Sequence, residues 1–166
     1  MTSGAIPRNF FYYWSGQGFL YAHYLGLVSL LRTNVVAQCA VYFDEEPREN
    51  PGWERLKRMP RVRLVKIDFP GLLRQAGCDP SGFMPVLGKE LSENQASDVF
   101  RYLILKCYGG VYIDFDTIAL RNLGPLLDTE FFIGWQHDAG QAPLNGAVMG
   151  AVRRSVCLER CLDRIR

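Results

Sequence analysis

Three features missing from this sequence limit what the protein can be. No apolar run approaches the roughly 20 residues needed to cross a bilayer, and the opening MTSGAIPRN lacks the basic-then-apolar order of a signal peptide. The formal net charge is only +2, so there is no basic excess for neutralising the phosphates of a nucleic acid. We therefore expect a soluble chain with no transmembrane segment and no nucleic-acid partner. A membrane anchor outside these residues would leave no trace in them.

The five cysteines lack the spacing of a metal site or a disulfide framework. Their number is odd, and they form neither a C-x-x-C pair nor a cluster with histidine. Cys157 and Cys161 are four residues apart and would share one face of a helix, which suits packing better than a crosslink. We expect mostly reduced thiols in the core and, with them, a reducing, cytoplasmic location.

What the sequence does have is the composition of one folded domain. Of its 166 residues, 48% are hydrophobic and 22% are charged, which is ordinary globular usage. No internal repeat and no linker rich in Pro, Gly or Ser divides the chain. We therefore treat residues 1–166 as a single domain, long enough to bury a core without staples.

Strand and helix patterns alternate along the chain. Apolar spacing predicts strands at 9–14, 35–43, 62–67, 111–115, 130–135 and 147–149, and helices at 20–31, 53–59, 96–108 and 155–165. This order predicts an α/β fold with a Rossmann-type, mostly parallel central sheet flanked by helices. Residues 70–89 contain three prolines and four glycines and are expected to form a loop, in a position suited to a lid. The last helix reaches Arg166 without a stop signal, so we expect the domain to continue beyond it.

The helix at 96–108 has the clearest pattern. Ser92 and Gln95 match a capping box at its beginning, and apolar residues then trace one face of the helix. Gly109 stands where a left-handed residue ends a helix, and Gly110 allows the sharp turn into the next strand. These glycines would aim the following strand at the site.

A pair of aspartates follows that strand. Asp114 and Asp116 lie at its carboxyl end, the edge of an α/β sheet where ligands usually bind, and strand alternation would point both carboxylates to one side. Two close carboxylates need a cation or open solvent, and a hard ion such as Mn²⁺ or Mg²⁺ fits them. An isolated D-x-D triplet also arises by chance at strand ends, so the motif alone does not define a metal site.

The residues around the D-x-D triplet make it more specific than the triplet alone. The segment ASDVFRYLILKCYGGVYIDFDTIAL resembles the sugar-binding region of DXD glycosyltransferases, which include initiating mannosyltransferases, α-1,4-galactosyltransferases and glucosylating bacterial toxins. IPRNFFYYWSGQ and PLNGAVMGA match more loosely. The resemblance implies a GT-A fold and a metal at Asp114 and Asp116. It also implies transfer, with retention, from a UDP- or GDP-sugar to a glycan or other hydroxyl acceptor, as in polysaccharide biosynthesis.

The resemblance also assigns individual residues. It implies that Asp98 and Arg101 contact the donor sugar, that Arg101 is catalytic together with the two aspartates, and that Tyr112, Trp14 and Asn145 bind the donor. Each has a plainer interpretation in the sequence. The first two match an i,i+3 surface ion pair, the tyrosine a core residue, the tryptophan a structural aromatic, and the asparagine a turn.

Two other functions remain open from the residues. The run Asp114 to Ile118 is close to the nucleophile motif of haloacid dehalogenase-like phosphatases, which need a later lysine, but no lysine follows Lys106. A noncatalytic sugar-nucleotide-binding module would carry the same motifs as the transferase. His137 and Asp138 follow a predicted strand and offer additional polar groups, although a single loop histidine is more often solvated.

Overall fold

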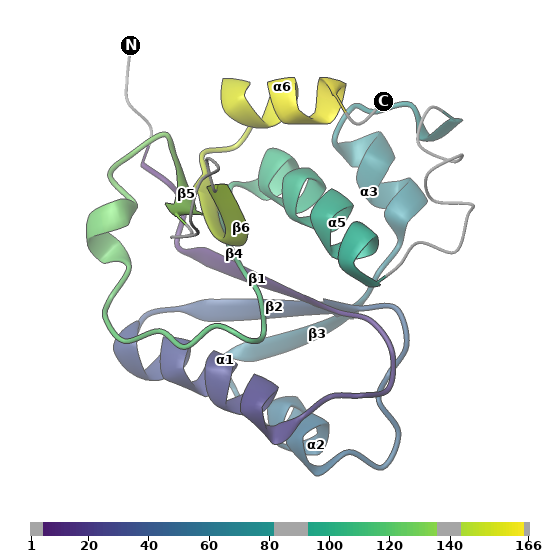
Figure 1. The fold of residues 1–166 in the computed structure, drawn as a ribbon, viewed down its shortest axis with the longest axis vertical. Helices are drawn as coiled ribbons and strands as arrows, with labels where there is room; N and C mark the ends of the chain where they lie inside the picture. Colours follow the sequence, from purple (N-terminus) through teal and green to yellow (C-terminus); the bar gives the residue numbers. More distant parts are fainter. Residues whose placement is uncertain (1–4, 82–92, 136–143, 165–166) are drawn as a thin grey trace, which may run out of the picture.

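Six strands form one sheet. Their spatial order is β3 (Val62–Lys66), β2 (Gln38–Phe43), β1 (Asn9–Trp14), β4 (Gly110–Ile113), β6 (Leu144–Ala151) and β5 (Phe131–Trp135) (Figure 1). The computed structural model describes residues 5–81, 93–135 and 144–164. The first four strands of this order are mutually parallel, whereas β6 is antiparallel to both β4 and β5. The mostly parallel α/β sheet predicted from the sequence is confirmed, with an antiparallel hairpin added at one edge.

Helices cover both faces of the sheet (Figure 1). One face carries α1 (Tyr21–Thr33) and α2 (Pro51–Lys57), and the other carries α3 (Phe69–Gln75), α5 (Glu93–Tyr108) and α6 (Val156–Asp163). A 3₁₀ turn, η1 (Gly124–Leu126), lies on the way from β4 to β5. Within the described residues, no helix is both long enough and apolar enough to cross a membrane.

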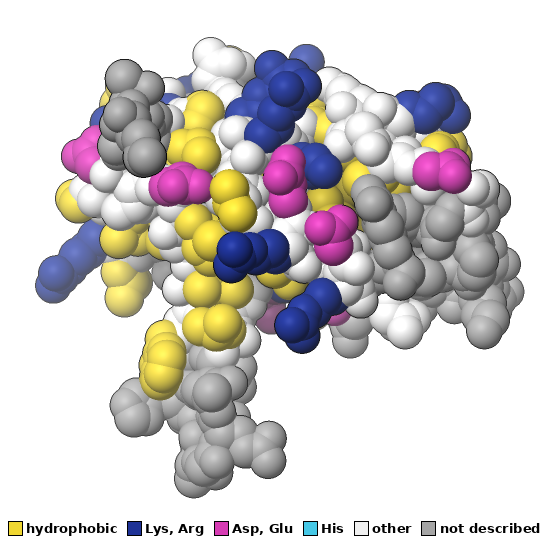
Figure 2. Space-filling model, turned by 90° about the horizontal axis from the view of Figure 1, so that it is seen from above, with side chains coloured by type: hydrophobic (Ala, Val, Ile, Leu, Met, Phe, Trp, Pro, Cys, Tyr) yellow, Lys and Arg dark blue, Asp and Glu magenta, His cyan; other side chains and the backbone are white. Residues whose placement is uncertain are grey.

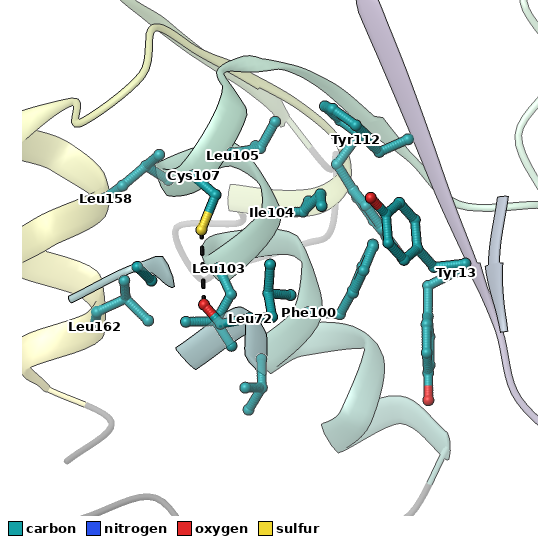
Figure 3. Packing of buried hydrophobic residues seen from close by; sticks show 14 of the residues in the cluster. Tyr13, Leu72, Phe100, Leu103, Ile104, Leu105, Cys107, Tyr112, Leu158 and Leu162 are labelled. Carbon is teal, nitrogen blue, oxygen red and sulfur yellow. Dashed lines mark hydrogen bonds between the residues drawn. The ribbon is translucent and has the colours of Figure 1, made fainter. Parts of the chain in front are cut away.

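The alternation of β1 divides its side chains between two cores. Phe10 and Tyr12 pack among the residues of α1 and α2, whereas Phe11 and Tyr13 pack among those of α3, α5 and α6. Figure 3 shows the second core, where the apolar face of α5 meets the sheet and α6. Both cores are continuous, so the strands and helices form a three-layer sandwich.

The hairpin of β5 and β6 exposes large apolar side chains. Figure 2 shows a band of hydrophobic side chains on one face of the molecule. Trp135 is 69% exposed and its cross-strand partner Leu144 is 66% exposed. This end of the hairpin therefore presents apolar surface to its surroundings.

Several predicted element boundaries were wrong. The expected loop at 70–89 begins inside α3, because Asp68 caps that helix by accepting from Gly71 N at 3.0 Å and because proline is tolerated in a first turn. The remainder of that loop beyond residue 81, including its suggested role as a lid, lies outside the described residues, as does Ser92. Strand β2 begins only at Gln38, since Val35 and Val36 are exposed in the turn before it.

The turn between α5 and β4 agrees with the sequence. Gly109 has φ +63°, the left-handed value expected at the end of a helix, and Gly110 has φ +130°. All five cysteines are free, and Cys39, Cys78 and Cys107 are buried as expected. Burial raises the pKa of Cys107 to about 11, so this thiol is unreactive at neutral pH.

Candidate functional site

A cavity of about 310 Å³ opens at the carboxyl ends of β1 and β4. Its walls come from the end of β1, from α1, from α5 and from the residues after β4: Tyr13, Trp14, Ser15, His23, Ser97, Asp98, Arg101, Asp114, Phe115 and Asp116. A cavity of about 370 Å³ lies at the opposite edge of the sheet, where its charged side chains are Arg61 and Arg63. The carboxyl edge is where parallel sheets bind ligands, and it holds the carboxylates, so the first cavity is the candidate site.

The two aspartates reach this cavity through a turn. Strand β4 ends at Ile113, before the first of the two aspartates, whereas the sequence predicted a strand that continues to Phe115. Asp114 N still donates to Ala147 O at 2.8 Å, and Thr117 N then donates to Asp114 O at 3.2 Å to close a turn over 114–117. The expected strand geometry is therefore wrong, and it is the turn that brings both residues to the same cavity.

Helix α1 holds that turn in place. At Gly26 an added Cβ would lie 2.5 Å from Phe115 O and 2.8 Å from Thr117 O, so only glycine permits this approach. Ser29 Oγ then accepts a hydrogen bond from Ala119 N at 2.8 Å. Neither residue was predicted from the sequence, because a glycine and a serine inside a helix carry no signal of a distant backbone partner.

An aromatic cluster anchors the turn from below. Phe115 is 4% exposed, and its ring centroid lies 4.8 Å from that of Tyr12 and 5.2 Å from that of Phe19. Trp14 meets Phe115 edge to face at 5.8 Å, and its Nε1 donates to Gly16 O at 2.8 Å. The tryptophan therefore packs as a structural aromatic while still forming part of the cavity wall.

A chain of hydrogen bonds links helix α5 to Asp114. Tyr112 donates its hydroxyl proton to Asp114 Oδ1 at 2.5 Å, which leaves Ser97 Oγ to donate to the tyrosine oxygen at 2.8 Å. Arg101 Nη2 donates in turn to Ser97 Oγ at 3.0 Å. Tyr112 is only 1% exposed, so it lies beneath the cavity and acts on the aspartate. Ser97 was missed by the sequence analysis although it directly precedes Asp98.

Arg101 lies between two carboxylates. Its Nη2 is 3.1 Å from Asp98 Oδ1 and 3.6 Å from Asp114 Oδ1, and the guanidinium carbon is 4.9 Å from the centroid of the Tyr112 ring. The arginine side chain is 11% exposed, whereas that of Asp98 is 59% exposed. The i,i+3 ion pair foreseen from the sequence thus forms, and the same arginine also faces the aspartate of the turn.

Burial works against a charge on Asp114. It raises the pKa of this carboxyl; the hydrogen bond from Tyr112 and the charge of Arg101 lower the pKa, and Asp116 and Asp98 raise it further. The pKa of His23, on the opposite wall, is lowered from its ordinary value. Burial lowers the pKa, and the charge of Asp116 offsets only part of this effect. A cation placed between Asp114 and Asp116 would relieve the unfavourable charge.

The donor set fits a hard divalent ion. Among the described residues no group of three or more His, Cys, Asp or Glu side chains is arranged to hold a metal. Mg²⁺ and similar ions are commonly bound by one or two carboxylates, with waters and phosphate oxygens as the remaining ligands. Asp114 and Asp116, which line one cavity, match this open mode of binding. They do not form the closed set of protein ligands that a structural metal site has.

The remaining predicted residues lie elsewhere. Asn145 is in β6 opposite Gly134 and accepts from Ala147 N at 2.7 Å, and it does not line the cavity. Its observed contact fits the local turn interpretation. His137 and Asp138 lie outside the described residues.

Known proteins resemble this chain both in the sequence around the D-x-D triplet and in fold. Residues 77–133 match the family model described as a glycosyltransferase sugar-binding region containing a DXD motif. An uncharacterized protein of Arabidopsis thaliana is 29% identical over 160 residues, covering 92% of this chain and 24% of that protein. The resemblance drawn from the sequence to DXD glycosyltransferases is confirmed.

Two solved structures have the same architecture. The PaToxG glycosyltransferase superposes with a TM-score of 0.72 at 19% identity, covering 98% of this chain and 60% of that one. The UDP-bound glycosyltransferase domain of the YGT toxin gives 0.64 at 10% identity, covering 97% and 61%. The fold is that of the GT-A glycosyltransferases. The chain spans about a quarter of the Arabidopsis relative and about 60% of each toxin structure.

Proposed function

We propose that residues 1–166 form a single nucleotide-sugar-binding domain that transfers a sugar from a UDP- or GDP-sugar to a glycan or other hydroxyl acceptor. The observation that carries this proposal is the meeting of Asp114, Asp116 and Arg101 at one cavity on the carboxyl edge of the sheet. Two carboxylates and an arginine suit a diphosphate that arrives with a divalent ion. The five free cysteines support a reducing, cytoplasmic location.

Asp114 and Asp116 would hold Mn²⁺ or Mg²⁺. Such an ion supplies positive charge that stabilises the departing diphosphate. Tyr112 keeps one oxygen of Asp114 hydrogen-bonded, which fixes the carboxylate and leaves Oδ2 for the cavity. Arg101 adds a fixed positive charge 3.6 Å from Asp114, where it can orient phosphate or sugar oxygens.

The reaction exchanges one bond to the anomeric carbon for another. The acceptor oxygen forms a bond to that carbon while the bond to the diphosphate breaks, and the electron pair leaves with the nucleoside diphosphate. The acceptor proton passes to an oxygen of the leaving phosphate. We propose attack from the face that the diphosphate leaves, with retention, because Asp114 and Asp116 are committed to the cation and Asp98 is paired with Arg101.

The donor nucleotide would lie against the end of β1. Trp14 and Ser15 line the cavity there, and Ser15 Oγ is fixed by a 2.5 Å hydrogen bond to Asp44 Oδ2. The UDP-bound toxin domain supports a uridine diphosphate in a fold of this kind. An aromatic edge with nearby backbone groups suits a planar base.

The proposal is tested by incubating the protein with a panel of UDP- and GDP-sugars, with and without Mn²⁺. We expect slow, Mn²⁺-dependent release of one nucleoside diphosphate, detected by chromatography. Cleavage of phosphomonoesters would indicate the phosphatase instead, and nucleotide-sugar binding without turnover would indicate a noncatalytic module.

A further inference from the structure

A further cavity, of about 610 Å³, adjoins the candidate site. It lies between helix α5, helix α6 and the hairpin of β5 and β6, and it is called here the hairpin groove. Asp98 and Arg101 line both this groove and the cavity that holds Asp114 and Asp116. Any molecule lying in the groove would therefore have one end beside the donor site.

The groove changes character along its length. Its charged side chains are Asp98 and Arg101, at the junction of the two cavities. Away from the junction its lining is largely apolar: Val99, Tyr102, Phe131, Ile133, Leu144 and Met149. Val99 and Met149 are buried at the base of the groove. Tyr102, Phe131 and Ile133 are half-buried and Leu144 is 66% exposed, so these four side chains supply its accessible apolar surface. Figure 2 shows the hydrophobic band beside acidic and basic side chains.

We propose that the hairpin groove binds the acceptor, and that the acceptor is amphipathic, with a hydroxyl-bearing head and an apolar alkyl or aryl group attached to it. This inference rests on the proposed function for the role of the head, which meets the donor at Asp98 and Arg101. The volume is in the range of small-molecule sites, and burial of each methylene adds to affinity in proportion to area. A purely polar sugar would leave the aromatic and aliphatic walls of the groove in water.

The test compares probes that share a head and differ in the apolar group. Binding of methyl, hexyl and phenyl β-D-glucosides is measured by calorimetry on the protein loaded with Mn²⁺ and UDP. We expect the hexyl and phenyl compounds to bind with Kd values at least tenfold lower than the methyl compound. A greater gain for hexyl than for phenyl identifies an alkyl acceptor, and the reverse identifies an aryl acceptor.

Charged substitutions at the exposed rim then locate the binding. Leu144→Lys and Cys157→Lys place an ammonium in the groove at exposed positions, where folding tolerates it, and each should abolish the preference for the hexyl compound. Val156→Lys is the matched control, since Val156 is the neighbouring residue of α6, is 55% exposed and does not line the groove. This control should keep the preference unchanged.

Two readouts separate this inference from the proposed function. Equal Kd values for the methyl and hexyl compounds, or a preference that survives both lysine substitutions, would overturn the acceptor groove even if nucleotide-sugar turnover is present. The opposite result is a preference for the hexyl compound that is lost only in Leu144→Lys and Cys157→Lys, in a protein that does not turn over nucleotide sugars. That result would establish the apolar groove and rule out the transferase reaction.

Discussion

The hydroxyl of Tyr112 donates to Asp114 Oδ1 across 2.5 Å, from a side chain that is almost wholly buried. Tyr112 lies in strand β4, and Asp114 lies in the turn that follows this strand. This bond therefore couples the rigid sheet to the group that is proposed to hold the cation. Hydrogen bonds of this kind orient metal ligands and tune their affinity.

Removing this hydroxyl should weaken cation binding. Tyr112→Phe keeps the ring beneath Arg101 but leaves Asp114 Oδ1 without its donor, so the carboxylate loses its fixed orientation. We expect Mn²⁺ affinity in the presence of UDP to fall about tenfold, the lower end of the range for such partners. Tyr108→Phe is the matched control, because that hydroxyl bonds Gln75 at the far end of α5. Unchanged Mn²⁺ affinity in Tyr112→Phe would contradict the assigned role.

Cation binding should also depend on pH through Asp114. Burial raises the pKa of this carboxyl, and protons compete with the metal below that pKa. As pH is lowered, Mn²⁺ affinity should begin to fall at a higher pH than it would for an ordinary aspartate. Because the Tyr112 hydrogen bond lowers the pKa, Tyr112→Phe should move the fall to still higher pH. Titration calorimetry at a series of pH values measures both curves, and coincident curves would count against this coupling.

The same pKa has a consequence for stability. A carboxyl whose pKa is raised by folding stabilises the protein while protonated, and this contribution is lost as pH rises through the folded-state pKa. At neutral pH the ionised Asp114 therefore opposes folding. We expect Asp114→Asn to raise the free energy of unfolding at pH 7 by about 0.5–2 kcal/mol, the usual size of a single stabilising substitution. It should also abolish the Mn²⁺-dependent gain in melting temperature with UDP.

Denaturant unfolding without metal measures this change. Asp128→Asn, at an exposed residue after η1, serves as the control and should leave the free energy of unfolding unaltered. A destabilised Asp114→Asn protein would mean that the ionised carboxylate stabilises the fold.

Gly26→Ala offers a test of the turn that changes none of its charged groups. In Gly26→Ala the new methyl would press on two backbone carbonyls, those of Phe115 and Thr117, which cannot rotate away. We expect a loss of about 1–3 kcal/mol in the free energy of unfolding, as for other overpacked sites, and weaker Mn²⁺ binding as the turn shifts. Gly18→Ala is the control, because nothing lies within 4 Å of its Cβ position. Equal effects of the two substitutions would show that α1 does not position the turn.

Much of the fold could be predicted from local pattern. Strand β1 follows from its short aromatic run, and the end of α5 follows from helical spacing and the glycine at 109, all of which act within a few residues. The start of α3 was missed because Asp68 and Pro70 resemble loop residues until the capping bond is seen. The antiparallel direction of β6 was missed because strand direction depends on pairing across the sheet.

The site was predictable only in its chemistry. Asp98, Arg101, Asp114 and Asp116 meet at one cavity, but the sequence placed the aspartates on a strand and the structure places them on a turn. Ser97 and Gly26 act through contacts with residues distant in the chain, and no local rule marks them. Asn145 lies in β6 and does not line the cavity, and its Oδ1 accepts from Ala147 N in the same strand.

Asp114 and Asp116 are proposed to hold together a cation that binds a nucleoside diphosphate. Calorimetric titration of UDP into the natural chain and into Asp116→Asn, each with Mn²⁺ and with EDTA, measures this directly. We expect micromolar UDP binding that needs Mn²⁺ and an affinity at least tenfold lower in Asp116→Asn. Equal UDP affinity in EDTA, or in Asp116→Asn with Mn²⁺, would show that the two aspartates do not hold such a cation.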